Sequence, residues 1–142
     1  MNNKQTLKVI DALKKSIENI GLEMTISNLT NNKNKCKDLI DFILNITCIE
    51  FGKSKEDLKK GKQNHTYKKL YLISSYLLYY HASLTQQEIG DILSKSKASI
   101  NRFIKEINEY NENIKEQKIT LVTLRNLEQQ VVNQKKIIYN NG

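Results

Sequence analysis

The segment from Ser83 to Asn108, SLTQQEIGDILSKSKASINRFIKEIN, places the tightest constraint on the fold, because it predicts two short amphipathic helices joined by a turn. Thr85 and Glu88 have the spacing of a capping box, which marks the start of the first helix. The apolar residues that follow define a single helical face: Ile89, Ile92 and Leu93. Gly90 carries no side chain, so another helix can approach closely there.

The polar residues 94–96 interrupt this pattern, and a second amphipathic helix follows them. Its apolar stripe consists of Ile100, Phe103, Ile104 and Ile107. Its opposite face is rich in lysine, arginine, serine and asparagine, which contact phosphates and base edges when a helix lies in the major groove of DNA. We therefore expect a helix-turn-helix whose turn and recognition helix bind DNA through Lys95, Lys97, Ser99, Asn101, Arg102 and Lys105.

The composition of the whole chain indicates an all-α fold. The 142 residues include no proline and only five glycines, and no run of alternating β-branched residues predicts a strand. The apolar fraction of 39% gathers into periodic stripes, which suits thin helical layers more than one large globular core. The length is enough for one domain with an extension.

The N-terminal part predicts helices separated by a polar loop. Residues 5–20 form one amphipathic pattern, and residues 36–48 form a second. Between them, the run Asn-Asn-Lys-Asn-Lys at 31–35 predicts a loop. After a further turn, Ser54 and Asp57 have the spacing of another cap, which predicts a short helix.

Two longer helices complete the expected architecture. The segment 66–81 is apolar and aromatic on most faces, so we expect it to be the buried central helix. The recognition helix shows no clear stop, because apolar residues continue at helical spacing as far as Ile114. Beyond it, apolar residues resemble a heptad seam: Leu121, Leu124, Leu127, Val131 and Ile138. This C-terminal helix either pairs with a second copy of the chain, as in a coiled coil, or folds back on its own domain.

The basic charge is concentrated in the middle of the chain. The formal net charge is +8, and residues 51–110 hold eleven basic and six acidic residues, which accounts for five of the eight charges. We divide the chain into an N-terminal helical segment (1–50), a helix-turn-helix domain (51–110) and a C-terminal helix (111–142) through which a homodimer is expected. Lysines of the basic loop and of the start of the long helix are expected to contact DNA phosphates: Lys59, Lys60, Lys62, Lys68 and Lys69.

Motifs of other function classes are missing from this sequence. Cys36 and Cys48 lie twelve positions apart without a second pair, so we expect buried thiols in a reducing cytoplasm and no metal site. No serine, cysteine and histidine residues stand at a catalytic spacing, so we expect no enzyme, no cofactor and no small-molecule substrate. No segment approaches the roughly 18 apolar residues of a membrane span. Residues 1–15 show no apolar h-region and no small-residue cleavage site, so we expect no signal peptide. We therefore expect a cytoplasmic protein without membrane contact.

Residues 51–110 resemble the C-terminal DNA-binding domain of the bacterial replication initiator DnaA. In that family, a short helix with an Asp-Leu pair, here Asp57–Leu58, precedes a basic loop, a long helix and a helix-turn-helix. Glu88–Asp91 stands at the place of the family's Glu-Ile-Gly element. Ser99–Ile100 stands where the family has threonine or serine followed by valine, and Lys69 where it has an arginine.

The chain departs from this family at the head of the recognition helix. The family has an Arg-Asp-His-Ser/Thr-Thr run, whereas this chain has Lys-Ser-Lys-Ala-Ser at 95–99, with a turn one residue shorter and no Asp-His pair. No phosphate-binding loop of the type Gly-x-x-x-x-Gly-Lys-Ser/Thr occurs. The resemblance therefore implies a helix-turn-helix fold of the DnaA and Trp-repressor type that binds double-stranded DNA, without the initiator's origin sequence or its ATP chemistry.

Two functions fit this sequence. The first is a sequence-specific double-stranded DNA-binding protein, such as a small transcription regulator or a replication-linked factor, in which the recognition helix reads bases and the basic loop neutralises phosphates. The alternative is a helical protein–protein interaction or oligomerisation module, such as a phage or plasmid adaptor, in which the helix-turn-helix only packs. Binding to random duplex DNA and its dependence on salt separate the two.

Overall fold

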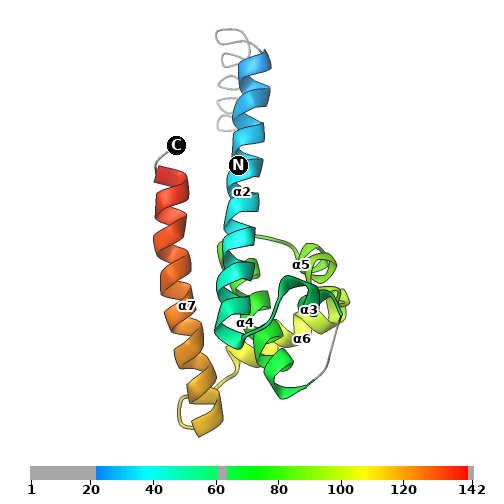
Figure 1. Cartoon of the computed structure of the whole chain (residues 1–142), viewed down its shortest axis with the longest axis vertical. Helices are drawn as coiled ribbons and strands as arrows, with labels where there is room; N and C mark the ends of the chain where they lie inside the picture. The colour runs from blue at the N-terminus through cyan, green and yellow to red at the C-terminus, as the bar shows by residue number, and fades with distance from the viewer. Residues whose placement is uncertain (1–21, 61–63, 141–142) are drawn as a thin grey trace, which may run out of the picture. The chain divides into compact units, whose positions relative to one another are not determined.

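The computed structural model of the chain describes residues 22–60 and 64–140, with side chains described from residue 36 on. In this part every regular element is a helix, which confirms the predicted all-α class. The chain divides into two compact units, Met1–Cys36 and Lys37–Gly142, and apart from the course of α2 and the burial of Cys36 the description below concerns the second. In chain order the helices are α2 (Leu22–Phe51), α3 (Lys55–Lys59), α4 (His65–His81), α5 (Gln86–Leu93), α6 (Lys97–Asn108) and α7 (Lys115–Asn140), as Figure 1 shows.

The predicted loop at 31–35 is wrong, because α2 continues through it and extends past both ends of the predicted helix 36–48. Asparagine is only a weak helix former, and residues 22–51 hold no glycine or proline that would stop the helix. The helix ends before Gly52, whose φ of +64° is the left-handed conformation common at helix C-termini. The amphipathic helix predicted at 5–20 lies outside the described residues.

Helix α4 is the centre of the core, as predicted. It contacts α5, α6 and α7. Five of its aliphatic side chains have no exposed surface: Leu70, Leu72, Ile73, Leu77 and Leu78. The same hydrophobic cluster includes Leu39 and Ile43 of α2, Ile89 of α5 and Ile100 of α6. A helix that is apolar on most of its faces is stable in water only when it is surrounded in this way.

The local capping predictions are confirmed. Ser54 and Asp57 form a capping box that starts α3, and Thr85 and Glu88 form another that starts α5. The hydrogen bond from the Thr85 backbone N–H, joined by that of its side chain, holds the pKa of Glu88 below its ordinary value. These short-range bonds satisfy backbone groups that the first turn of a helix leaves without partners, which is why they can be found from sequence alone.

The close approach expected at Gly90 is made by the turn that follows α5 and not by another helix. A Cβ atom at this position would lie 2.4 Å from the backbone oxygen of Lys95. The chain reverses there because Ser94 adopts a left-handed conformation with φ of 56°, and the Lys95 N–H then donates to the Gly90 carbonyl. Ser96 caps the start of α6 directly after this turn.

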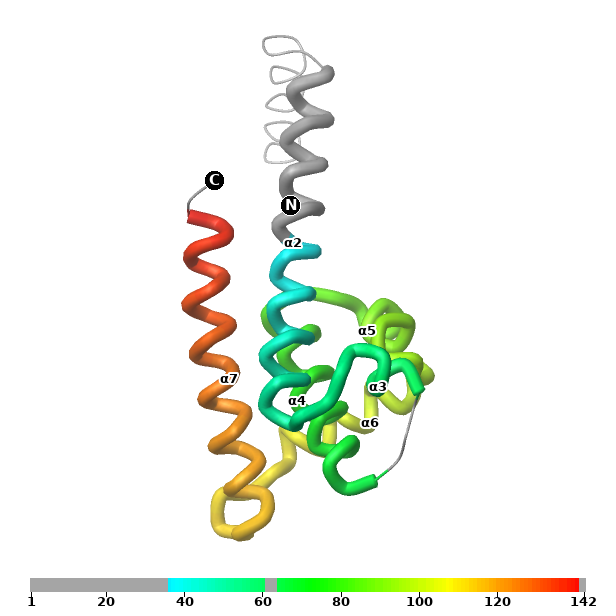
Figure 2. Tube along the Cα trace, viewed as in Figure 1, coloured from blue at the N-terminus to red at the C-terminus, as the bar shows by residue number. Residues whose placement is uncertain are grey.

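Helix α6 ends at Asn108, which corrects the expectation that it continues without a stop. The connection from 109 to 114 turns the chain into α7, as the tube in Figure 2 traces. Asparagine favours such turns because its side chain bonds to nearby backbone groups. Here the Asn113 N–H donates to Oδ1 of Asn111 at 2.9 Å, and the Asn111 N–H donates to Oε1 of Gln117 at 2.8 Å.

Helix α7 packs on α4 of its own chain, so the structure shows the fold-back arrangement of the predicted seam. Three seam residues are buried in the common core, namely Leu124, Leu127 and Val131, and the other two, Leu121 and Ile138, pack against it. Nε2 of His81 at the end of α4 lies 2.7 Å from Oε2 of Glu128, which ties the two helices at a second point.

The two cysteines differ in burial. Cys48 is buried as predicted, and burial raises the pKa of its thiol. Cys36 is only partly buried, against the prediction, and Leu39, three residues further on, is the first buried side chain described in α2. None of the described helices is long and apolar enough to cross a membrane.

Candidate nucleic-acid interface

The polar side of α6 carries most of the predicted recognition residues. The side chains of Lys97, Arg102 and Lys105 are exposed, and those of Ser99 and Asn101 are partly exposed. Three residues of its apolar stripe, Ile100, Ile104 and Ile107, are buried, whereas Phe103 is only partly buried, and the helix packs with α4 and α5. The 3.6-residue period therefore separates an anchored face from a cationic face, as the sequence predicts.

Asn101 is held by a residue that sequence reasoning missed. Nε2 of Gln86, the first residue of α5, donates to Oδ1 of Asn101 at 3.2 Å. The bond holds the Asn101 amide against the start of α5. No sequence signal connects the two residues, because they become neighbours only when α5 and α6 cross.

The start of α6 is organised by a chain of serine and arginine hydrogen bonds. Oγ of Ser96 accepts from the Ser99 N–H at 3.1 Å and donates to Oγ of Ser99 at 3.0 Å. Nη2 of Arg102 also donates to Oγ of Ser99, at 3.2 Å. Because Ser99 stands in the first turn of α6, this bond brings the Arg102 guanidinium to the positive end of the helix dipole, and that turn contains no acidic residue. This end of the helix favours an anion.

The predicted basic-loop residues fall into three groups. Lys59 and Lys60 are exposed at the end of α3, Lys68 and Lys69 lie on the first turns of α4, and Lys62 lies outside the described residues. Helix α4 starts after Asn64, because Oδ1 of this cap residue accepts a hydrogen bond from the Tyr67 N–H at 3.0 Å. The capped start therefore fixes where the two lysines of α4 stand.

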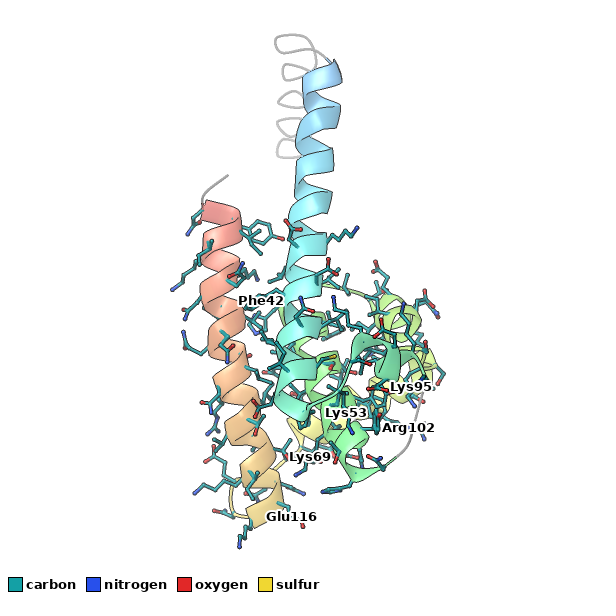
Figure 3. The ribbon with its side chains drawn as sticks, in the orientation of Figure 1. Phe42, Lys53, Lys69, Lys95, Arg102 and Glu116 are labelled. Atoms are coloured by element: carbon teal, nitrogen blue, oxygen red, sulfur yellow. The ribbon has the colours of Figure 1, made fainter. Side chains whose placement is uncertain are left out.

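Residues from both predicted sets meet around one pocket of about 540 Å³. Its cations are Lys68 from α4, Lys95 from the turn and Arg102 from α6. None of the described residues that line it is acidic. Figure 3 shows Lys95 and Arg102 on the same side of the unit. Three cations that are distant in sequence thus converge on one concave site, which we call the basic pocket.

Two aromatic rings form the apolar part of the basic pocket. Tyr71 and Phe103 are stacked, with ring centroids 5.8 Å apart and planes within 9° of parallel. Nζ of Lys95 lies 4.5 Å from the Tyr71 ring centroid, within cation–π distance. The Tyr71 hydroxyl donates to the Leu58 carbonyl at 2.9 Å, and burial raises its pKa. These contacts fix the position of the ring on which Lys95 rests.

A carboxylate stands beside Lys68 and limits the positive charge there. Nζ of Lys68 lies 3.1 Å from Oε1 of Glu106, and the Tyr110 hydroxyl donates to Oε2 of the same carboxylate at 2.9 Å. Burial, together with this hydrogen bond, raises the pKa of Tyr110 to about 12. Tyr110 therefore stays protonated at neutral pH and keeps orienting Glu106 toward α4.

The basic pocket gathers four of the predicted site residues: Lys68, Lys95, Ser99 and Arg102. The other six described members of the two predicted sets lie outside it: Lys59, Lys60, Lys69, Lys97, Asn101 and Lys105. Lys97 instead lines a separate, open groove that includes Thr85 and Gln86 at the start of α5. The polar face of α6 thus has two sides, one toward α4 with Arg102 and one toward α5 with Asn101.

Two residues that line the basic pocket, Asn64 and His65, were not predicted as site residues. Lys53, also outside the predicted set, has its Nζ 4.8 Å from the Tyr67 ring centroid. The cap spacing before the apolar helix could have placed Asn64 at the start of α4. The position of Lys53 depends on how the segment after α2 packs, for which the sequence holds no local signal.

No protein-family model, no curated protein and no solved structure matches the chain. The likeness to the DnaA domain is therefore a likeness of sequence motifs alone.

Proposed function

We propose that the chain is a sequence-specific double-stranded DNA-binding protein in which α5 and α6 act as a helix-turn-helix. The observation that carries the proposal is the convergence of Lys68, Lys95 and Arg102 on the basic pocket beside the exposed face of α6. Basic residues gathered along one side of a helix are the electrostatic footprint expected of a protein that follows a phosphate backbone. A transcription regulator or a replication-linked factor in the cytoplasm would use such a surface.

The two sides of α6 support two different roles in DNA binding, one in phosphate contact and one in base reading. Arg102 faces the pocket, where its guanidinium fork suits the oxygens of a phosphate and supplies affinity without reading sequence. Asn101, next to α5, is the better candidate for reading bases, because asparagine pairs with adenine edges in the major groove. Arg102 is one of the residues predicted on the recognition helix, and its hydrogen bond to Ser99 on the pocket side assigns it to phosphate binding in this proposal.

A homodimer through the C-terminal seam is not part of the proposal, because α4 of the same chain already covers that seam. The outward side of α7 and its connection supports the alternative function, an interaction module. Large apolar side chains are exposed there: Ile114, Ile119, Val122, Ile137 and Tyr139. Exposed apolar side chains that form a contiguous patch are typical of a surface that binds another protein.

Selection of bound sequences from a random duplex pool, followed by Asn101→Ala, tests the base-reading role. The substitution is expected to cost about 1–3 kcal/mol of binding free energy on the selected site and much less on random DNA. Fluorescence anisotropy on both duplexes measures the difference. Lys105→Ala, on the same helix, is the matched control and is expected to weaken both duplexes equally. If Asn101→Ala also weakens both equally, Asn101 does not read bases.

A further inference from the structure

The basic pocket is larger than a phosphate contact requires. Its volume of about 540 Å³ lies in the range of small-molecule sites, which is roughly 300–1,000 Å³. A phosphate group would occupy the cationic part and leave the region against Phe103 unfilled. The combination of a cationic part and an aromatic wall fits a ligand that carries a phosphate and a less polar group attached to it.

The donors at the cationic part are arranged for phosphate oxygens. Arg102 presents a planar fork, Lys68 a point charge, and Ser99 a hydroxyl that already accepts from Arg102 at 3.2 Å. Lys68 approaches from α4, and the other two belong to α6, so an anion between them is held from two sides. The start of α6 adds the positive end of its dipole.

The ion pair between Lys68 and Glu106 is the main internal competitor for this anion. Its two side chains are 52% and 36% exposed, so Lys68 can turn from the carboxylate to a ligand at small cost. Glu106 also repels an anion that enters the pocket. Removing its charge should therefore strengthen binding, an effect opposite in sign to that of removing a cation.

We infer that the basic pocket is a phosphate-ester site that takes one phosphate with its attached sugar, the sugar lying against Phe103. The residues of the basic pocket are sufficient to argue that it binds a phosphate ester. That this ester is a nucleotide of the DNA backbone rests on the proposed function. A free sugar phosphate or mononucleotide carries the same groups and is the other source.

The test uses the full chain and three probes: ribose 5-phosphate, inorganic phosphate and a random DNA duplex. Backbone amide shifts in NMR spectra follow the two small probes, and competition against labelled duplex shows whether they share a site. Ribose 5-phosphate is expected to bind more tightly than inorganic phosphate, to shift Lys68, Ser99 and Arg102, and to displace the duplex. Arg102→Ala should weaken the ribose 5-phosphate complex about tenfold.

Glu106→Gln tests the opposite effect, a gain in affinity when a negative charge beside the pocket is removed. Glu112→Gln is the control, because it removes the same charge elsewhere. Glu112 pairs with Arg125 and does not line the basic pocket. Glu106→Gln is expected to raise the affinity for ribose 5-phosphate about threefold, and Glu112→Gln to leave it unchanged. Equal effects of the two substitutions would overturn a local site.

The outcomes separate the two proposals. Duplex binding that ribose 5-phosphate does not weaken, with no shifts at Lys68 or Arg102, overturns the pocket inference and leaves DNA binding intact. Binding of ribose 5-phosphate without any duplex binding overturns the proposed function and identifies a free phosphate ester as the ligand. If neither ribose 5-phosphate nor the duplex binds, the pocket inference and the proposed function are both wrong.

Discussion

Replacing Lys68 and Arg102 together by alanine is expected to weaken binding to any DNA duplex by about 100-fold at 0.1 M salt. Each residue is expected to supply roughly one charge-assisted contact to phosphate, and each such contact is worth about 1.5 kcal/mol or more. The effect should not depend on sequence, because phosphates carry no base information. The slope of log affinity against log salt should also flatten by about 2, since roughly 0.9 of a counterion is released per phosphate.

A double substitution of Lys118 and Lys136 on α7 is the control for this experiment. Both lysines are exposed, and their removal changes the net charge by the same amount. Fluorescence anisotropy across a salt series measures all variants, and urea unfolding checks that the exposed substitutions leave stability within about 0.5 kcal/mol. A loss of equal size in the control would show that affinity follows net charge alone and that the basic pocket has no special role.

Gly90→Ala is expected to lower the free energy of unfolding by about 2 kcal/mol, which is a packing cost near the top of its range less the gain in helix propensity. In an ordinary helix interior this change stabilises a protein by about 1 kcal/mol, because alanine is the better helix former. Here the new Cβ would stand 2.4 Å from the Lys95 backbone oxygen, so the turn between α5 and α6 must move. Forcing an extra carbon into a filled site costs about 1–3 kcal/mol, and backbone cannot move aside like a flexible side chain.

Gly52→Ala is the matched control. That position has no heavy atom within 4 Å of a new Cβ but a φ of +64°, so only the cost of a left-handed alanine applies, about 1 kcal/mol. Urea unfolding followed by circular dichroism compares the two. Gly90→Ala should also weaken DNA binding under conditions in which the variant is still folded, because Lys95 belongs to the displaced turn. A neutral or stabilising Gly90→Ala would contradict the close approach on which the α5–α6 geometry depends.

Features set by neighbours in the sequence could be predicted. The capping boxes at Ser54 and Thr85 depend on residues three positions apart, and both exist in the structure. The buried helix α4 followed from the density of its apolar residues. The error at 31–35 arose because asparagine only weakens a helix, whereas a break also needs a competing turn conformation such as that of Gly52.

Features set by tertiary packing could not be predicted. The seam of α7 suits a partner chain and its own α4 equally well, and only the path of residues 109–114 decides between them. The convergence of Lys68, Lys95 and Arg102 depends on how α4 crosses α6. The pair of Gln86 with Asn101 and the carboxylate of Glu106 beside Lys68 have the same origin. The residue types of the site were therefore visible in the sequence, and their grouping around the basic pocket was not.

A salt titration of the full chain on a random DNA duplex tests the central claim most directly. If the cationic side of α6 and the start of α4 hold a phosphate backbone, log affinity should fall linearly with log salt with a slope of about −5, as for roughly six neutralised phosphates. No measurable binding at low salt, or an affinity that salt leaves unchanged, would contradict the proposed function.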